Sequence, residues 1–260
     1  MRLETRLQRQ LFNRTTRAVH LTDTGRAFLD HCRRIITDRD EAFALMSEGT
    51  EPQGDLRVTC STPMGEKFIA PLARQFALDH PKVNVTLELT NHLVDIVADG
   101  FDLAIRTGQL ADSRLIGTRI ASRTLHTCAA PKYLRSRAAP RRVSDLSQHD
   151  CLIGTAATWH FQRGNREELF RPKGRWRCNN GTAVKDAAVA GMGICQLPDF
   201  YVLREIADGR LITVLEECQP EPEPIWALYP QRRHLSPKVN SFIELLRSAL
   251  PPALRGETAQ

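Results

Sequence analysis

The sequence has no apolar run long enough to cross a membrane. A membrane span needs roughly 18 consecutive apolar residues, and no stretch approaches this length. Met1 is followed by Arg-rich sequence without the apolar segment of a signal peptide. With 42% hydrophobic and 25% charged residues, the 260-residue chain is ordinary for a soluble globular protein of one or two domains. We therefore expect a cytoplasmic protein with no membrane partner.

Paired cysteine motifs are also missing. The seven cysteines form no CxxC pair and lie scattered through strand-like and helix-like segments, which argues against a zinc site and a disulfide framework. We expect the cysteines to be small buried residues of a protein in a reducing compartment. We expect no metal and no cofactor. Redox sensing through Cys178 or Cys195 is the alternative, although neither has a neighbouring cysteine in the sequence.

The common catalytic motifs are absent as well. GxSxG, HExxH, GxGxxG and the P-loop do not occur, although eight histidines and Ser61 offer a base and a nucleophile in principle. We therefore expect a protein that is not an enzyme, and we assign no catalytic residue.

Acidic residues are scarce at the start of the chain. Residues 1–20 hold one acid, Glu4, whereas the whole chain has 36 Lys and Arg against 30 acids and a net charge of +6. A local positive patch suits a phosphate backbone, and a solvated charged face is the alternative. The arginines of this segment are Arg2, Arg6, Arg9, Arg14 and Arg17.

The clearest local pattern lies at residues 54–81 and predicts a strand, a polar turn and a helix. Leu56, Val58 and Cys60 alternate with polar residues, and Ser61 and Thr62 stand before Pro63 where the helix begins. A helix N-terminus beside two hydroxyl groups is typical of a site for a carboxylate or another small anion.

The same alternation of strands and helices continues along the chain. It predicts an α/β protein with a mainly parallel sheet, whose ligands bind at the C-terminal ends of the strands. Two such units, with a change of domain near Tyr133, imply a cleft between them. The predicted strands are 83–89, 102–106, 115–121, 125–129, 151–153, 194–198, 211–215 and 225–229, with a hairpin in 159–176; the predicted helices are 93–99, one opening at 179–182, 200–207 and 237–250.

An apolar stripe marks another helix, which Thr22 and Asp23 cap. Its members recur at alternating steps of three and four, with only Arg39 interrupting the series, as in a short coiled coil. We favour a helix–helix dimer through residues 22–48, and the alternative is a helix packed on its own domain. The stripe consists of Leu29, Cys32, Ile36, Phe43 and Met46.

Taken together, several stretches resemble the LysR-type transcriptional regulators. Residues 11–17 (LFNRTTR) and 21–25 (LTDTG) resemble the family's wing and the start of its linker helix. Residues 54–58 (GDLRV), 100–106 (GFDLAIR) and 190–198 (AGMGICQLP) resemble three parts of its effector module. The resemblance is closest to the CrgA-like subgroup, and the residues that indicate this are 130–134, 149–152, Trp159 and Phe161.

The resemblance implies an α/β, two-subdomain effector module like the type 2 periplasmic binding proteins, preceded by a partial winged helix-turn-helix and a long linker helix. A stand-alone solute-binding protein is less favoured, since it needs a signal peptide and no basic wing. The implied division is 1–21 for the partial winged helix-turn-helix, 22–53 for the linker and dimerisation helix, 54–124 with 234–260 for the first effector subdomain, and 125–233 for the second.

The family's first two helices and most of its recognition helix have no counterpart before Met1. Base contacts come mainly from a recognition helix, so we expect weak, salt-sensitive DNA binding by this chain. Either the start codon lies too far downstream, or the protein is a truncated regulator that senses and dimerises. The residues expected to contact DNA are Arg2, Arg6, Arg14 and Arg17.

The resemblance also implies a pocket for an effector. Hydroxyl, amide and guanidinium groups suit a small organic acid or a polar aromatic molecule. Simpler roles compete: a helix cap at Ser61 and Thr62, an ion pair at Arg106, and a turn at Asn180. The expected protein is a homodimer or homotetramer that controls transcription, and the implied effector-binding residues are Ser61, Thr62, Thr90, Arg106, Thr107 and Asn180.

Overall fold

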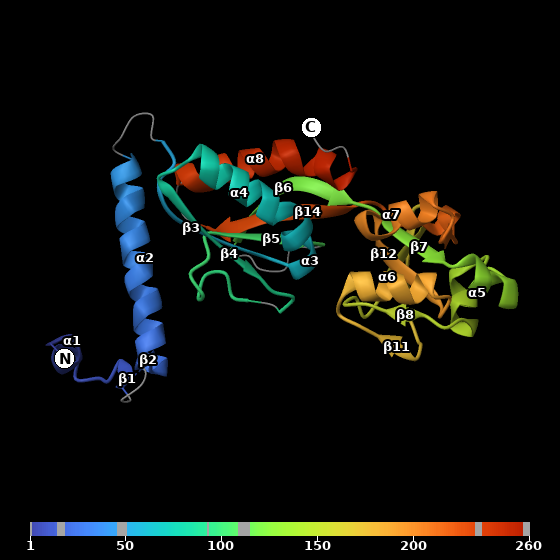
Figure 1. Cartoon of the computed structure of the whole chain (residues 1–260), viewed down its shortest axis with the longest axis horizontal. Helices are drawn as coiled ribbons and strands as arrows, with labels where there is room; N and C mark the ends of the chain where they lie inside the picture. Colours follow the sequence, from blue (N-terminus) through green and yellow to red (C-terminus); the bar gives the residue numbers. More distant parts are fainter. Residues whose placement is uncertain are drawn as a thin grey trace.

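The computed structural model describes residues 2–14, 19–45, 51–92, 94–108, 115–231 and 236–256. A short N-terminal unit leads into a long helix, and two α/β subdomains follow (Figure 1). Among the described residues, no helix is both long and apolar enough for a membrane span.

The N-terminal unit consists of α1 (Arg2–Leu7) and an antiparallel hairpin of β1 (Phe12–Arg14) and β2 (Val19–Leu21). Glu4 joins the two parts, because its carboxylate accepts hydrogen bonds from the backbone N–H groups of Leu11 at 2.8 Å and Phe12 at 3.0 Å. Strand β1 lies within residues 11–17, which resemble the family's wing, and we therefore call the hairpin of β1 and β2 the wing.

Helix α2 (Asp23–Leu45) starts directly on this hairpin. The Thr22 hydroxyl accepts a hydrogen bond from the Gly25 N–H at 2.9 Å, which is an N-cap contact. A Cβ at Gly25 would lie 2.1 Å from the Leu11 carbonyl oxygen, so only glycine allows this approach. From there α2 extends away from the wing and stands apart from both subdomains (Figure 1).

The first subdomain is a five-stranded sheet in the order β4-β3-β5-β14-β6. Strands β3, β4 and β5 are parallel, whereas β14 runs antiparallel to both β5 and β6. The sheet is therefore mixed, and the prediction of a mainly parallel sheet is wrong. The strands are β3 (Gly54–Cys60), β4 (Val83–Leu89), β5 (Leu103–Thr107), β6 (Leu115–Arg123) and β14 (Glu223–Pro230).

The position of β14 also corrects the expected boundary at residue 233. This strand was assigned to the second subdomain, but its hydrogen bonds lie in the first sheet. The physical reason is that the chain crosses between the subdomains twice, outward after β6 and back along β14 (Figure 1).

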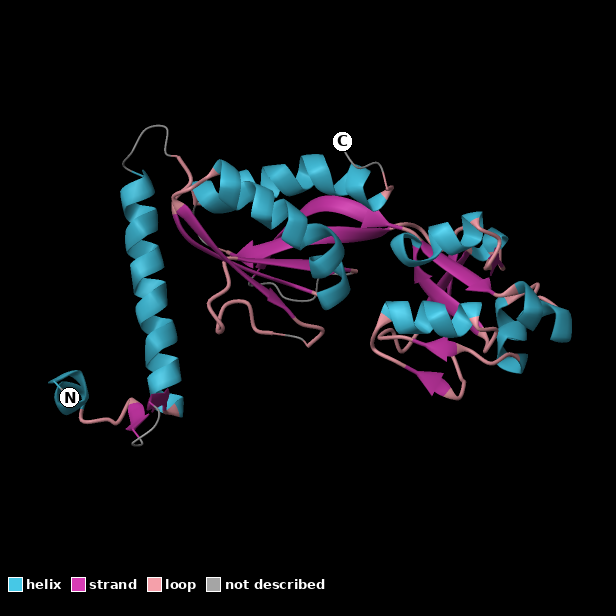
Figure 2. Cartoon of the chain, in the orientation of Figure 1, coloured by secondary structure: helices cyan, strands magenta, loops and turns pink. Residues whose placement is uncertain are grey.

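Helices cover one face of this sheet (Figure 2). Their apolar side chains form one core with the sheet, in which the Phe76 and Phe242 rings lie 5.0 Å apart. The predicted helix at 93–99 is wrong: residues 96–100 form a turn, in which the Asp95 carboxylate accepts from the N–H groups of Val97 and Ala98. The helical segments are α3 (Thr62–Met64), the π-helical η1 (Gly65–Ile69), α4 (Ala70–Asp79) and α8 (Pro237–Leu254).

The second subdomain is built on a sheet in the order β12-β7-β13, in which both pairs are antiparallel. Its helices include α5 (Pro131–Ser136), α6 (Gly181–Val189) and α7 (Asp199–Ala207). A hairpin of β9 and β10 confirms the predicted hairpin. The strands are β7 (Leu125–Ala129), β8 (Leu152–Ile153), β9 (Trp159–Arg163), β10 (Arg166–Phe170), β11 (Trp176–Arg177), β12 (Ile194–Pro198) and β13 (Ile212–Thr213), with 3-10 turns η2 (Val143–Gln148) and η3 (Glu216–Cys218).

Candidate functional site

A cleft of about 240 Å³ lies between the two subdomains. The first subdomain contributes residues that follow its parallel strands, which is where ligands bind in open α/β sheets. The second contributes the hairpin, the end of β12 and the starts of α6 and α7. The residues used below are Ser61, Met64, Asn91 and Thr107 on the first side, His160, Gln196, Phe200 and Tyr201 on the second, and Arg123 and Glu223 on the crossing strands.

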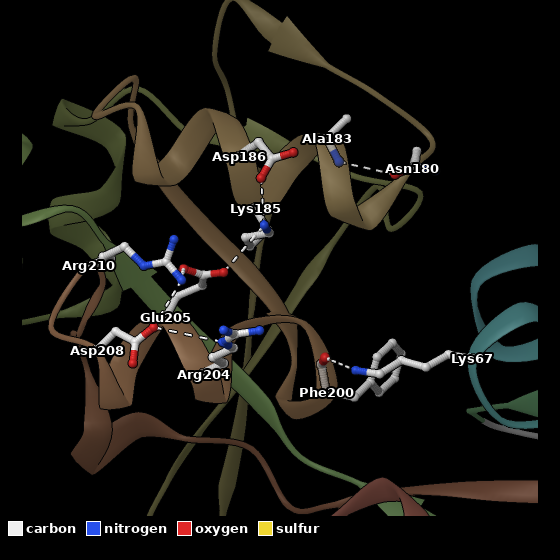
Figure 3. A network of polar contacts seen from close by, with 10 residues as sticks. All are labelled: Lys67, Asn180, Ala183, Lys185, Asp186, Phe200, Arg204, Glu205, Asp208 and Arg210. Atoms are coloured by element: carbon white, nitrogen blue, oxygen red, sulfur yellow. Dashed lines mark hydrogen bonds and ion pairs between the residues drawn. The ribbon is translucent and has the colours of Figure 1, made fainter. Parts of the chain in front are cut away.

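One contact ties the two walls of the cleft together. The Lys67 ammonium on η1 donates a hydrogen bond to the Phe200 carbonyl at 2.7 Å (Figure 3), and the Phe68 and Phe200 rings meet edge-to-face at 5.4 Å. Burial lowers the pKa of Lys67. The contact fixes α7 against the helix that begins at Thr62.

Helices α6 and α7 are braced against each other behind the cleft (Figure 3). Glu205 is only 6% exposed, and its carboxylate pairs with Lys185 at 3.4 Å and Arg210 at 2.6 Å. The Asn180 side chain accepts a hydrogen bond from the Ala183 N–H at 3.1 Å and so caps α6. These contacts set the directions of the two helix starts that face the cleft.

The two formally charged residues of the cleft neutralise each other. Arg123 on β6 donates to the Glu223 carboxylate on β14 at 2.8 Å. Their side chains are only 22% and 25% exposed, so solvent screens this pair incompletely. The pair joins the two strands that cross between the subdomains.

His160 is a cleft residue that the sequence interpretation missed. Its ring Nδ1 lies 2.8 Å from the Glu167 carboxylate on the neighbouring strand. The Gln196 amide accepts from the His160 N–H at 3.3 Å and donates to its carbonyl at 2.9 Å, like one rung of a β-ladder. Trp159 and Phe161 are buried, and the alternation of a strand therefore turns His160 to the other face. That alternation was the available signal.

Two of the six predicted effector residues, Ser61 and Thr107, line the cleft. Thr62, Thr90 and Asn180 are not among the lining residues. The Thr62 N–H donates to Asn91 at 3.2 Å, and the Thr90 hydroxyl accepts from the His92 N–H at 3.2 Å, so both take part in the turns beside the cleft.

Arg106 requires a correction. Its guanidinium donates to the Ile105 carbonyl at 3.1 Å and to the Thr59 hydroxyl at 3.4 Å, within its own sheet, and it does not line the cleft. Burial lowers the pKa of Arg106. The strand pleat directs this side chain along the sheet face that carries Thr59, which the position at a strand end did not reveal.

The predicted DNA and dimer residues belong to the first 46 residues of the chain, which the structure describes only in part. Arg6 is exposed on α1, whereas the side chains of Arg2 and Arg14 and all of Arg17 lie outside the described residues. On α2, Leu29 and Cys32 are half-buried and Ile36 is 50% exposed. The Phe43 side chain and Met46 also lie outside the described residues.

Burial makes three of the cysteines, Cys60, Cys151 and Cys195, less reactive. All seven are free thiols, and burial raises the pKa of Cys60 to about 12 and that of Cys151 to about 11. The sulfurs of Cys128 and Cys195 lie 3.5 Å apart in the core, where the neighbouring thiol and burial raise the pKa of Cys195. Among the described residues, no group of His, Cys, Asp and Glu could hold a metal ion.

Known proteins share both the sequence and this architecture. The LysR substrate binding domain matches residues 49–251, and an uncharacterized HTH-type transcriptional regulator of Haemophilus influenzae is 34% identical over 92% of this chain and 85% of its own length. The chain belongs to the LysR family. The HTH-type transcriptional activator AaeR of Escherichia coli is 32% identical over 94% of this chain and 81% of its own length.

Solved LysR-type structures have the same fold. The full-length virulence activator AphB of Vibrio cholerae aligns with a TM-score of 0.67 at 26% identity, over 95% of this chain and 86% of that one. CrgA of Neisseria meningitidis aligns with a TM-score of 0.65 at 28% identity, over 96% and 86%. The chain is a LysR-type transcriptional regulator whose effector module has the type 2 periplasmic-binding-protein fold, as the resemblance predicted. The family consists of regulators that bind DNA and effectors and oligomerise, rather than enzymes.

Proposed function

We propose that the cleft binds a small organic acid or polar aromatic molecule, and that this effector controls transcription through an oligomer joined by α2. The observation that carries the effector proposal is the lining of the cleft: hydroxyl and amide groups from Ser61, Asn91 and Thr107 face the Phe200 and Tyr201 side chains. A small number of polar groups among apolar and aromatic ones is typical of a ligand site.

The size of the cleft supports a small effector. Its volume of about 240 Å³ is below the roughly 300 to 1,000 Å³ of pockets that hold drug-sized ligands. Two helices begin at its walls, with Thr62 and Gly181 as their first residues. The positive end of a helix dipole favours negative charge, which suits an acid.

The oligomer proposal has α2 as its interface and the wing as its DNA contact. Ile35 is 68% and Ile36 50% exposed on a helix that stands apart from the subdomains (Figure 1). Burying such residues between two copies removes apolar surface from water. Arg6, Arg14 and Arg17 supply positive charge for phosphate contacts, and we place the activity in the cytoplasm, with DNA as its target.

A thermal-shift screen of small organic acids and polar aromatic molecules tests the effector proposal. Ligand at 100 times its dissociation constant stabilises the folded protein by about 2.7 kcal/mol. Thr107→Val removes one cleft hydroxyl and should weaken binding by about 1 to 3 kcal/mol. Thr90→Val is the matched control, since Thr90 does not line the cleft. A ligand that is weakened equally by both changes, or only by Thr90→Val, places the site elsewhere.

A further inference from the structure

The surplus positive charge of the chain is concentrated in two segments of the second subdomain. Residues 131–150 hold five Lys and Arg against two acids, and residues 171–177 hold four Lys and Arg and no acid. The nine basic and two acidic residues give these segments a net charge of +7, whereas the whole chain has +6. The rest of the chain is therefore close to neutral overall. The basic residues of the first segment are Lys132, Arg135, Arg137, Arg141 and Arg142.

The two segments lie side by side in the fold. The Lys173 carbonyl accepts a hydrogen bond from the Cys151 N–H at 3.0 Å, and β11 then runs parallel to β8. A Cβ at Gly174 would lie 2.0 Å from the Cys151 carbonyl oxygen, so only glycine allows this approach. Arg137, which follows α5, reaches the same place, since its guanidinium lies 3.5 Å from the Asp150 carboxylate. The two segments therefore form one surface, which we call the basic face.

Most charges of the basic face are exposed and unshared. All nine Lys and Arg residues are exposed to solvent. Within the described part of the chain, only Arg137 among them has an ion pair. The other acid, Asp145, accepts hydrogen bonds from the Arg141 and Arg142 N–H groups at 2.9 Å each, which holds its carboxylate at the start of η2. The basic residues of the second segment are Arg171, Lys173, Arg175 and Arg177.

The composition of the basic face fits phosphate groups better than a protein partner. Seven of its nine basic residues are arginines, whose planar guanidinium binds phosphate through two parallel hydrogen bonds. Within these two fully described segments, the one exposed large hydrophobic residue is Trp176, at 37%. A protein interface normally has an apolar core, and a single partly covered ring does not supply one.

We propose that the basic face is a second DNA-contact surface, which binds the phosphates of duplex DNA without reading the bases. Duplex DNA is the polyanion that suits this chain, because LysR-type regulators bind DNA. Phosphate contacts add affinity that is independent of sequence. This surface is distinct from the DNA contact of the proposed function, which is the wing. Because α5 and β11 lie at the opposite end of the molecule from the wing (Figure 1), the two surfaces contact different stretches of DNA.

The salt dependence of DNA binding by the full chain tests the proposal. Fluorescence anisotropy measures the affinity for a labelled duplex of mixed sequence, about 30 base pairs long, at salt concentrations from about 25 to 200 mM. The variant carries Arg171→Gln, Arg175→Gln and Arg177→Gln together, because none of these side chains has a hydrogen bond or ion pair within the described part of the chain. Each lost phosphate contact lowers the salt slope by about 0.9, so we expect the slope to fall by about 2 to 3 and the affinity at low salt to fall about tenfold or more.

A matched control removes the same charge from the first subdomain. Arg74→Gln, Arg119→Gln and Arg247→Gln change three exposed arginines outside the basic face and should lower the slope by less than about 1. An unchanged melting temperature without DNA shows that each triple variant folds. If the melting temperature of the first variant falls, Arg135→Gln with Arg141→Gln on the other segment replaces it, with an expected fall in slope of about 2.

The outcomes separate the basic face from the wing. If the basic-face variant keeps the wild-type slope, if the control lowers the slope equally, or if the wild type binds no duplex at low salt, the proposal is wrong. A loss in Arg6→Gln alone means that the wing contact stands without the basic face, whereas a loss in the basic-face variant alone means the reverse. Labelled poly-glutamate and a single strand of the same length are the competing probes. If the variant loses affinity for either of them by a larger factor than for the duplex, the partner is an acidic protein or a single strand, and the proposal is wrong.

Discussion

Helices α2 and α8 both carry apolar residues at helical spacing, but these residues differ in how deeply they are buried. Helix α8, with 18 residues, buries Val239, Phe242 and Leu246 against the first sheet. Helix α2, with 23 residues, leaves Ile35 68% and Ile36 50% exposed. Figure 2 shows α8 lying on the sheet and α2 standing free of it. An apolar stripe thus predicts that a helix face will be covered, but it does not identify the surface that covers it.

The difference has an energetic consequence. Burial of apolar surface contributes about 25 cal/mol per Å², and in α8 this contribution is made within one chain. In the proposed oligomer, α2 would gain the same contribution from a second copy, so that part would depend on protein concentration. We therefore expect changes in α8 to affect folding and changes in α2 to affect assembly.

The largest effect is expected from Phe242→Ala in α8. Phe242 is fully buried and contacts the Phe76 ring, so its truncation should leave a cavity and cost about 3 to 5 kcal/mol of unfolding free energy. Urea unfolding of the full chain measures this loss. Leu78→Ala on α4 is the control, because Leu78 is 68% exposed and should change stability by less than about 1 kcal/mol. Equal losses would contradict the assignment of the core.

Ile36→Glu in α2 should have the next largest effect, on assembly. A carboxylate in an apolar helix–helix interface is costly, and we expect the dimer dissociation constant to rise about a hundredfold or more, with little change in the melting temperature of the subdomains. Sedimentation measures it. Ala27→Glu adds the same charge at an exposed position of α2 outside the stripe and should leave the dimer intact. A monomeric wild type at tens of micromolar would refute the role of α2.

Gly25→Ala should loosen the joint between the wing and α2. The added methyl group would lie 2.1 Å from the Leu11 carbonyl oxygen, so backbone must shift. We expect a local cost of about 1 to 3 kcal/mol, visible as faster hydrogen exchange in β1, β2 and the start of α2 only. Gly154→Ala is the control, because a Cβ there meets nothing within 4 Å. Faster exchange throughout the subdomains would show that α2 is not an independent unit.

The smallest effect is expected from Arg6→Gln and Arg14→Gln on DNA binding. If each arginine makes the proposed phosphate contact, each change should weaken binding a few-fold on any sequence and reduce the salt slope by about 1. Arg247→Gln serves as the control, because Arg247 belongs to α8 and this helix lies far from β1 and β2 in Figure 1. A change in sequence preference, rather than in general affinity, would mean that these residues read bases.

Local elements of the fold were predictable from the sequence for a physical reason. Alternation at residues 54–60, followed by Ser61 and Pro63, specifies a strand that ends and a helix that starts, and β3 and α3 follow this pattern. The basic hairpin and the cap at Thr22 are also encoded by neighbouring residues. Such signals span only a few positions, so the backbone conformation follows from nearby side chains.

Features that depend on distant partners were not predictable in this way. The pattern of residues 225–229 indicates a strand but not that it pairs antiparallel with β5 and β6. At the candidate site, a strand-end position favoured Arg106 over His160, yet the pleat and the packing of β9 brought His160 to the cleft. Pairing and side-chain direction depend on contacts between segments far apart in the chain.

The sequence by itself determined the α/β class and most of the order of the elements, because periodicity, caps and turn residues act over a few neighbours. The family followed from the resemblance of its motifs to those of known regulators. Only the tertiary structure decided which strands the chain uses to cross between subdomains, which side chains line the cleft, and that Ile35 and Ile36 of α2 are left exposed. These features arise when residues that are far apart in the chain, such as Arg123 and Glu223 at a separation of 100 residues, come within hydrogen-bonding distance. Short sequence patterns do not show which distant residues will come into contact.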